Sequence, residues 1–564
     1  MTATVPVSAA IGRTLATLGA AHVFGVVGSG NFHLTNAMVD TGVPFTAARH
    51  EMGATVMADA YSRTSDRVAV VSLHQGCGLS NALTGIAEAA KCHTPLLVVT
   101  GDTATGDVNS NFHVDQDAAV RAMGATAARV YSAETAVADT ARAYIRAVTE
   151  RETVVLSVPV DIQDRIVELD ETSITLPRVH RAGPSSQALT DLVELLAGAR
   201  RPVILAGRGA RHAKTELVRL ADHAGALLVT SAGARGLFAD QEWALDVMGG
   251  FSTEGAAELI AAADVVVGFG ASLNKWTGRD GALMRGATVV HVDDRPAAIG
   301  RHRDVALGVI GDAAIVAALA ADQLEQRPRS GTHRGYRTAD VARRVHAARY
   351  WRDQPFEPLR DPGCIDPREL TNLLDELLPA ERIVVPDGGN VNCYPAGHLR
   401  VPDVRGFCFP LAFQAIGMGI AAGIGAGIAQ PGRVPVVGTG DGAFMMSLAE
   451  LDTAVRARLG LVVIVYNDSA YGAEVNLFRP YTDDLDIVRF PDTDMARVAR
   501  GFGAEGVTVR EISDLGPVRE WVDGPRDRPL VIDAKIATFP SWLMAQRYVL
   551  AEDATHNDLS SELA

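Results

Sequence analysis

Two short apolar runs on either side of a glycine-rich acidic turn constrain this chain more than any other feature. The first run, residues 433–438, leads into a Gly-Asp-Gly turn centred on Asp441, and a helical pattern of apolar residues follows. The second run, residues 461–466, precedes an Asn-Asp pair that ends at Asp468. This order predicts strand, turn, helix and strand. Because neighbouring parallel strands finish at the same edge of a sheet, we expect Asp441 and Asp468 to lie side by side.

Two carboxylates beside a glycine-opened turn at the start of a helix suit a diphosphate that is held through a divalent metal ion. Glycine lets the backbone approach a ligand closely, and the helix N-terminus favours an anion. Carboxylate oxygens suit Mg²⁺, which commonly bridges protein carboxylates to phosphates. A Gly-Asp-Gly turn is also common in loops, so spacing alone leaves an ordinary βαβ unit with an acidic turn as the alternative.

The turn, the helix and the Asn-Asp pair together resemble the thiamine-diphosphate signature of the acetolactate synthase, pyruvate decarboxylase and benzoylformate decarboxylase superfamily. In that pattern Mg²⁺ binds the aspartate of the turn, the second residue of the Asn pair and a backbone carbonyl two residues later. The matching positions are Asp441, Asp468 and the carbonyl of Ala470. Asp468 stands where many members have asparagine, so oxygen ligation is kept and a negative charge is added. The resemblance also implies further cofactor contacts, from Gly388, Asn390, Ile416, Gly440, Gly442, Ala443 and Tyr471.

Ile416 lies within a run, residues 411–426, that is small and apolar throughout. The run predicts a tightly buried helix. The family motif places a bulky apolar residue beneath the cofactor to impose a bent conformation, and Ile416 matches it. Plain core packing of Ile416 is the alternative, and it is physically almost the same arrangement.

Length and composition limit the class of protein. A chain of 564 residues is too long for one hydrophobic core and suggests three or four domains. A net charge of −15 disfavours nucleic acid and anionic membranes as partners. No signal peptide or membrane-spanning apolar run is evident in the sequence. The five cysteines form no CxxC pair and no metal-like cluster, so we expect a cytoplasmic protein.

The chain is expected to form an α/β protein with three open parallel-sheet domains. A helix is expected at residues 5–18, a linker rich in proline, arginine and serine at residues 177–187, and an arginine-rich surface connector at residues 323–361. The resemblance implies a pyrimidine-binding domain, a central Rossmann-like domain, a diphosphate-binding domain and a polar tail, at residues 1–176, 188–322, 362–547 and 548–564. The last residues, 551–564, are expected to be disordered or to form a flexible lid.

Residues 46–63 predict the end of a strand and then a helix rich in small residues, with Glu51 at the junction. The family places its cofactor-activating glutamate in this context, hydrogen-bonded to N1′ of the aminopyrimidine ring. A carboxyl group is needed there because proton exchange at N1′ turns the amino group into an imino base, which removes the thiazolium C2 proton. A structural role for Glu51 as a helix N-cap is the alternative.

Three more catalytic candidates follow strands or lie in loops of the same region. Ser29 comes after a predicted strand, residues 22–27, where benzoylformate decarboxylase has a substrate-contacting serine; a turn or cap role is the alternative. His74 directly follows a buried strand, like the catalytic histidine of benzoylformate decarboxylase, and could exchange a proton with the substrate. His113 lies in a polar loop, residues 103–116, that carries catalytic histidines in pyruvate decarboxylase-like enzymes. Structural or solvated histidines are the alternatives.

The central region contains two weak signals for a nucleotide. Residues 207–209 (Gly-Arg-Gly) and 291–293 (His-Val-Asp) could belong to such a site, because some relatives bind flavin or an adenine nucleotide there. A Rossmann-like spacer that braces the other domains is the favoured interpretation, so FAD is an alternative and not the favoured cofactor. Thr277 stands where benzoylformate decarboxylase has a second active-site histidine, which argues against simple transfer of that chemistry.

Glu474 matches an active-site glutamate of pyruvate decarboxylase-like enzymes, whereas the arginine and tryptophan that acetolactate synthases use for a second keto acid are absent nearby. The resemblance therefore implies a decarboxylase or carboligase that uses thiamine diphosphate and Mg²⁺. It would act through an enamine intermediate on a 2-oxo acid, with or without an aldehyde acceptor.

Acetolactate synthesis and a flavin-containing oxidase are the alternatives. A non-catalytic paralogue would be expected to lose Glu51 or the metal aspartates. Family sites lie between subunits, so a homodimer or homotetramer is expected.

Overall fold

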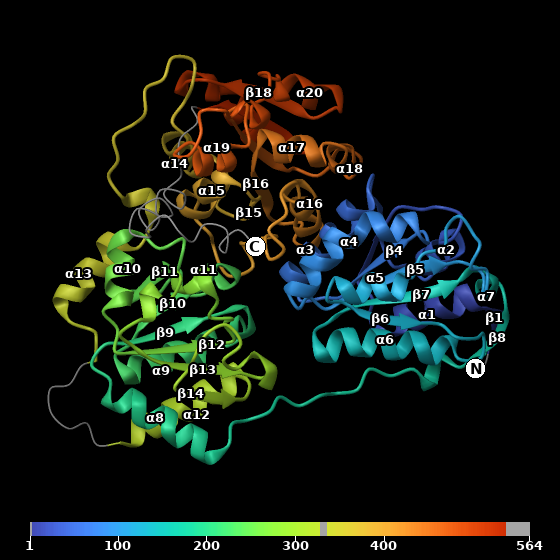
Figure 1. Cartoon of the computed structure of the whole chain (residues 1–564), viewed down its shortest axis with the longest axis horizontal. Helices are drawn as coiled ribbons and strands as arrows, with labels where there is room; N and C mark the ends of the chain where they lie inside the picture. Colours follow the sequence, from blue (N-terminus) through green and yellow to red (C-terminus); the bar gives the residue numbers. More distant parts are fainter. Residues whose placement is uncertain (1–2, 328–334, 537–564) are drawn as a thin grey trace.

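Three separate parallel β-sheets, each flanked by helices, organise the chain (Figure 1). The computed structural model describes residues 3–327 and 335–536. Within those ranges no helix has both the length and the apolar character needed to cross a lipid bilayer. The expectation of an α/β protein with three open parallel sheets is confirmed. The tail at residues 548–564, including the disorder or lid expected for 551–564, lies outside the described residues.

The first sheet, drawn in blue to cyan in Figure 1, has six parallel strands in the order β3-β2-β4-β5-β7-β6. A short antiparallel pair, β1 with β8, lies apart from it. The central strands of the six-stranded sheet are apolar and buried on both faces, as expected where helices cover a parallel sheet. The strands are β1 (Ala3–Pro6), β2 (His22–Gly25), β3 (Phe45–Ala47), β4 (Ala69–Leu73), β5 (Leu96–Asp102), β6 (Thr126–Arg129), β7 (Thr153–Pro159) and β8 (Ile166–Leu169). The helices are α1 (Val7–Leu18), α2 (Phe32–Val39), α3 (Glu51–Ser65), α4 (Cys77–Lys91), α5 (Gln116–Ala122), α6 (Ala136–Glu150) and α7 (Val160–Gln163).

The second sheet, drawn in green, has six strands in the order β11-β10-β9-β12-β13-β14, all parallel. Its strands are β9 (Pro202–Ala206), β10 (Leu227–Thr230), β11 (Ala244–Val247), β12 (Val265–Phe269), β13 (Thr288–Asp293) and β14 (Leu307–Ile310). Its helices are α8 (Ser186–Gly198), α9 (Lys214–Ala224), α10 (Glu254–Ala261), α11 (Lys275–Gly278) and α12 (Ala313–Gln326), followed by α13 (Ala339–Ala348).

The third sheet, drawn in orange to red, has five parallel strands in the order β15-β16-β17-β19-β18. Its strands are β15 (Arg382–Pro386), β16 (Val434–Gly440), β17 (Val462–Asn467), β18 (Glu505–Val509) and β19 (Leu530–Lys535). Its helices are α14 (Pro367–Leu377), α15 (Cys393–His398), α16 (Gly419–Ala429), α17 (Asp441–Ser447), α18 (Glu450–Arg456), α19 (Gly472–Phe478), α20 (Met495–Gly501) and α21 (Gly516–Asp523).

Two expected helices in the third region differ from the structure. The helix expected at 411–426 begins only at Gly419, because Gln414 and Gly417 have φ values of 62° and 83°, in the left-handed region. The preceding residues therefore form a loop that bends into α16. The single helix expected after the acidic turn is two short helices, since α17 ends at Ser447 and α18 begins at Glu450. A uniformly apolar composition does not reveal such breaks.

Two smaller expectations also change. The first helix begins at Val7 rather than at residue 5, because the chain before it pairs as β1 with β8. The surface connector expected at 323–361 holds a real helix, α13. It is tied to the second region by a hydrogen bond from the Thr253 hydroxyl to the Ala348 carbonyl and one from the Tyr336 hydroxyl to the Leu259 carbonyl.

The first and third regions pack through α3 and α16, which lie side by side. Glycine makes this approach feasible: a Cβ added at Gly425 would lie 2.0 Å from the carbonyl oxygen of Met57. Arginines reinforce the junction. Arg63 donates to the Phe409 carbonyl, and Arg211 of the central region donates to the carbonyls of Arg63 and Val404.

We predict that Gly425→Ala destabilises the protein by about 1–3 kcal/mol, because the added methyl group must force α16 away from α3. Thermal unfolding followed by circular dichroism should show a lower midpoint. Gly432→Ala is the matched control, since nothing lies within 4 Å of a Cβ added there. Equal midpoints for the two variants would contradict the close packing of α3 on α16.

Candidate active site

The two predicted metal aspartates meet at the carboxyl edge of the third sheet. Strands β16 and β17 are parallel neighbours, with Gly440 opposite Tyr466, and Asp441 and Asp468 each come directly after one of them. Burial raises the pKa of both carboxyl groups, and the charge of Asp441 raises the pKa of Asp468 further. Oδ1 of Asp441 and Oδ2 of Asp468 are buried with no hydrogen-bond partner. Two such oxygens fit a divalent cation, which would supply the missing positive charge.

The surroundings of the pair leave room for ligands other than protein side chains. In the described part of the chain, no three His, Cys, Asp or Glu side chains gather as a metal-binding group. A cation at this pair would therefore take further ligands from backbone, solvent or a bound diphosphate. The start of α19 packs closely against this pair, because a Cβ added at Gly472 would lie 2.4 Å from Oδ2 of Asp468. The residues present therefore fit a metal-bound diphosphate.

Most of the predicted cofactor-contact residues lie at the same edge. Gly440 is the N-cap of α17, and Ala443 is buried within that helix. A Cβ at Gly442 would lie 2.5 Å from the ring of Tyr471, which precedes α19. Asn390 is buried in a short 3₁₀ helix near Asp468.

Ile416, on the loop before α16, lies against Gly388, which is in the turn after β15. A Cβ added at Gly388 would lie 2.8 Å from Cγ2 of Ile416, so the isoleucine covers that turn. Ile416 is half-buried and also lines the large cavity described below. It is therefore available for contact with a ligand as well as for packing.

Asp387 organises these turns, and sequence reasoning missed its role. The side chain is wholly buried and accepts hydrogen bonds from the backbone amides of Gly388, Gly417 and Gly419 at 2.8–3.0 Å and from the Thr439 hydroxyl at 3.1 Å. Burial raises the pKa of Asp387, and these hydrogen bonds oppose that effect. One carboxylate thus joins three segments of the site. An aspartate between a buried strand and a Gly-Gly turn was the only signal in the sequence.

Glu51 is the first residue of α3, at the edge of the first sheet. The N-cap of this helix is His50, whose Nδ1 accepts from the amide of Met52 at 3.1 Å, so Glu51 is not the cap. Oε2 of Glu51 accepts a hydrogen bond from Nδ2 of Asn81 at 3.0 Å. The carboxyl group is thus held from α4 and not by its own helix.

Ser29 and His74 form a hydrogen-bonded pair next to Glu51. Nδ1 of His74 lies 2.8 Å from the Gln75 carbonyl oxygen, and Nε2 lies 3.3 Å from Oγ of Ser29. A carbonyl oxygen only accepts, so in the neutral ring Nδ1 carries the proton and Nε2 accepts from the Ser29 hydroxyl. Phe112 packs edge-on against the His74 ring, with centroids 5.0 Å apart. His113 is exposed in the adjacent loop.

Glu51 and the aspartate pair belong to different regions of the chain, at the first and the third sheet respectively. Glu474, in the first turn of α19, is exposed and lines a cavity of about 2230 Å³ to which all three regions contribute residues. Thr277 lines the same cavity.

A second missed residue, Glu450, links the third region to the segment that precedes Glu51. Its carboxylate, on α18, accepts from the backbone amides of Arg49 at 3.1 Å and His50 at 2.9 Å. A Cβ at Gly53 would lie 2.2 Å from its Oε1. The helix that follows the metal-site helix therefore fixes the start of the Glu51 helix. No local pattern predicts a contact between residues about 400 positions apart.

The large cavity extends into the central region, where basic side chains dominate part of its lining. His93, which follows α4 of the first region, lines the cavity beside these basic side chains. Its burial is the main cause that lowers its pKa to about 4, and the positive charges of central-region arginines, including Arg295 and Arg208, lower it further. The predicted Gly-Arg-Gly turn packs backbone to backbone: a Cβ at Gly207 would lie 2.1 Å from the carbonyl oxygen of Gly270. His291 is buried within β13. These contacts fit a tightly braced domain, and they leave the flavin alternative untested.

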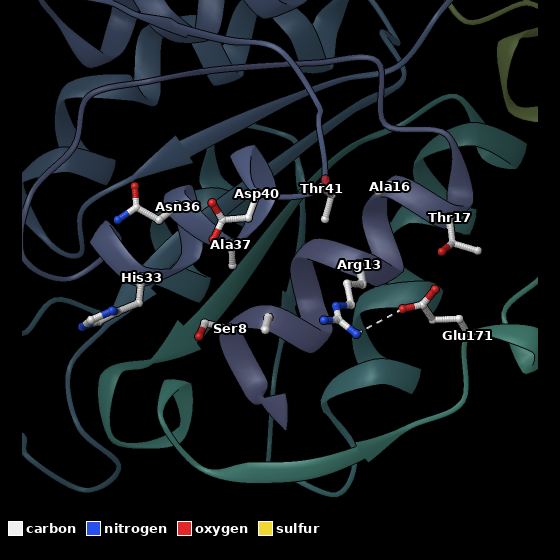
Figure 2. A pocket seen from close by; sticks show the side chains of 11 residues that line it. Ser8, Arg13, Ala16, Thr17, His33, Asn36, Ala37, Asp40, Thr41 and Glu171 are labelled. Carbon is white, nitrogen blue, oxygen red and sulfur yellow. Dashed lines mark hydrogen bonds and ion pairs between the residues drawn. The ribbon is translucent and has the colours of Figure 1, made fainter. Parts of the chain in front are cut away.

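A smaller, open pocket lies between α1 and α2 (Figure 2). Arg13 of α1 pairs there with Glu171 at 3.5 Å, and the pocket is also lined by His33 and Asn36 of α2 and by Asp40, which directly follows α2. None of the predicted site residues lines this pocket.

Comparison with known proteins decides the family. Models of the thiamine pyrophosphate enzyme N-terminal TPP-binding, central and C-terminal TPP-binding domains match residues 6–122, 189–321 and 387–534. The chain belongs to the thiamine pyrophosphate enzyme family. It is therefore a thiamine-diphosphate-dependent enzyme of the lyase or transferase kind.

The relatives of this thiamine pyrophosphate enzyme have several activities. A sulfoacetaldehyde acetyltransferase of Alcaligenes xylosoxydans xylosoxydans is 30% identical over 546 residues, covering 90% of this chain and 89% of the relative. A probable 2-ketoarginine decarboxylase of Pseudomonas aeruginosa is 29% identical, covering 90% and 89%. A putative acetolactate synthase large subunit of Mycobacterium tuberculosis is 28% identical, covering 83% and 86%.

A solved structure shares the fold. The thiamine diphosphate-dependent 4-hydroxybenzoylformate decarboxylase of Rhodococcus jostii RHA1 superposes with a TM-score of 0.79 at 21% identity, covering 94% of this chain and 99% of that one.

Proposed function

We propose that this thiamine-diphosphate-dependent enzyme decarboxylates a 2-oxo acid, or joins it to an aldehyde, at a site assembled from two subunits. The observation that carries the proposal is the hydrogen-bonded Ser29–His74 pair beside Glu51, which supplies proton-transfer groups next to the position proposed for the cofactor ring. The arginine and tryptophan expected for a second keto acid are absent from residues 471–474. Acetolactate synthesis is accordingly the less favoured reaction.

The chain's own residues have distinct proposed roles. Asp441, Asp468 and the carbonyl of Ala470 would hold Mg²⁺ and through it the diphosphate. When bound, thiamine diphosphate would supply a carbon nucleophile for a carbonyl group and a thiazolium ring able to take up the electron pair released on loss of CO₂. Glu51 would hold and exchange the proton at N1′ of the pyrimidine ring.

Ser29 and His74 would act at the substrate carbonyl. Because Nδ1 of His74 is committed to the Gln75 carbonyl, Nε2 and the Ser29 hydroxyl form a short path that can deliver or remove one proton. Glu474, which faces the cavity, would serve the second proton transfer, at the product carbon or at the acceptor carbonyl. His113 is a weaker candidate, because among the described residues its side chain, unlike that of His74, makes no hydrogen bond to another predicted site residue.

Exposed apolar side chains support a homodimer as the smallest active unit, with a homotetramer as a further state. In the first region they include Phe32, Val108 and Phe112, which are 50%, 64% and 44% exposed. In the third region they include Met446 and Tyr481, at 51% and 54%. One proposed half-site holds Glu51, Ser29 and His74, and the other holds Asp441 and Asp468. A second copy of the chain would cover the exposed apolar side chains and bring the Glu51 of one subunit to the aspartate pair of the other. A cytoplasmic location stays a prediction.

We predict that binding of thiamine diphosphate requires a divalent cation at the aspartate pair. Calorimetry with Mg²⁺ should show tight binding that chelation of the metal weakens. Asp441→Ala should weaken Mg²⁺-supported binding by at least about 10–100-fold, the range known for disturbing the surroundings of metal ligands.

Asp468→Asn should keep metal-supported binding, because an amide oxygen can replace the carboxylate as a ligand. Asp484→Ala, a change at an exposed loop carboxylate, is the matched control and should bind like the parent protein. Unchanged affinity of Asp441→Ala in the presence of chelator and of Mg²⁺ alike would refute the assignment.

The reaction itself can be tested with a panel of 2-oxo acids. We expect the enzyme with thiamine diphosphate and Mg²⁺ to release aldehydes, or to form mixed 2-hydroxy ketones when an aldehyde is added, as identified by mass spectrometry. Glu51→Gln is the control and should lower product formation by about 10²–10⁴, the usual scale for loss of an acid–base group. Acetolactate as the dominant product from pyruvate would overturn the proposal.

A further inference from the structure

Three positions on one face of α4 bring this helix against the start of α3. Gly78, Asn81 and Gly85 are spaced at i, i+3 and i+7, so they lie on the same side of the helix. A Cβ at Gly85 would lie 2.9 Å from Cβ of Thr55, and a Cβ at Gly78 would lie 3.6 Å from Oε1 of Glu51. The two glycines thus let the helices approach, and Asn81 between them reaches the Glu51 carboxyl group.

The bond between Asn81 and Glu51 distinguishes the two carboxyl oxygens. Nδ2 of Asn81 donates to Oε2 of Glu51 at 3.0 Å, whereas Oε1 has no hydrogen-bond donor among the described residues. An oxygen that faces an N–H group is held as an acceptor. When Glu51 is neutral, its proton therefore resides on Oε1, the oxygen that is left available to a ligand.

We propose that Asn81 is a positioning residue that presents Oε1 of Glu51 to N1′ of the bound cofactor. The inference rests on the proposed role of Glu51 at N1′. A glutamate side chain loses considerable rotamer freedom when it is fixed, and the Asn81 hydrogen bond meets part of that cost before the cofactor arrives. Asn81 is the fifth residue of α4 and does not cap it, because Gly76 holds the N-cap position. Its side chain is therefore not committed to its own helix.

The test compares the cofactor with an analogue in which a C–H group replaces N1′. Calorimetry gives the affinity of each ligand in the presence of Mg²⁺, and the ratio of the two affinities isolates the N1′ contact. The affinity for the analogue also reports an intact fold and diphosphate site. Glu51→Ala should abolish the preference for the cofactor. Asn81→Leu, which has similar size and no donor, should reduce that preference about tenfold, the scale of a hydrogen bond to a charged group.

Two further variants complete the comparison. Asn81→Ala should behave like Asn81→Leu, which guards against misfolding caused by the larger apolar side chain. Ser80→Ala is the matched control, because the Ser80 hydroxyl donates to the Cys77 carbonyl on the same helix and not to Glu51. It should keep the parent's preference.

The outcomes separate the two claims. If Glu51→Ala keeps the parent's preference for the cofactor, the proposed contact of Glu51 with N1′ is wrong. If Glu51→Ala loses the preference while both Asn81 variants keep it, only the positioning role of Asn81 is overturned. A loss of preference in Glu51→Ala and in both Asn81 variants, with analogue binding unchanged, supports both.

Discussion

The electrostatic repulsion between two buried carboxylates that lie side by side is the main constraint on the third region. Parallel pairing of β16 with β17 places Asp441 and Asp468 at one edge, and each leaves one oxygen without a hydrogen-bond partner. Such an arrangement costs free energy unless a cation is bound. A divalent cation bound as proposed between the two carboxylates would offset this cost.

The wholly buried Asp387 shows how the rest of the edge is kept in place. Its carboxylate gathers amides from the turn after β15 and from the start of α16, together with the Thr439 hydroxyl of β16. Glu450 plays the corresponding part between regions, since it fixes the amides that precede α3. The edge that carries Asp441 and the segment that leads into Glu51 are thus fixed to each other within one chain.

The sequence could predict those parts of the site that depend on local pattern. Alternating strands and helices imply the three parallel sheets, and strand ends at one edge imply that Asp441 meets Asp468. Local pattern failed for the helix expected at 411–426, because the left-handed backbone at Gln414 and Gly417 has no signature in apolar composition. It also missed Glu450, whose partners are about 400 residues away. Local pattern also gave no sign of Asn81, because its contact with Glu51 depends on the packing of α4 against α3 and not on the sequence of α4 alone.

In the proposed assembly, one active site takes Glu51 from one subunit and the aspartate pair from another. Mixing two inactive variants tests this arrangement most directly. Glu51→Gln and Asp441→Ala are to be co-expressed with different affinity tags, and the doubly tagged heterodimer isolated and assayed with a 2-oxo acid that the parent protein decarboxylates. A shared site predicts that the heterodimer regains activity, because one of its two sites contains neither substitution. If both residues instead serve a site within one chain, every site in the heterodimer is damaged, and activity no higher than that of the separate variants would contradict the account.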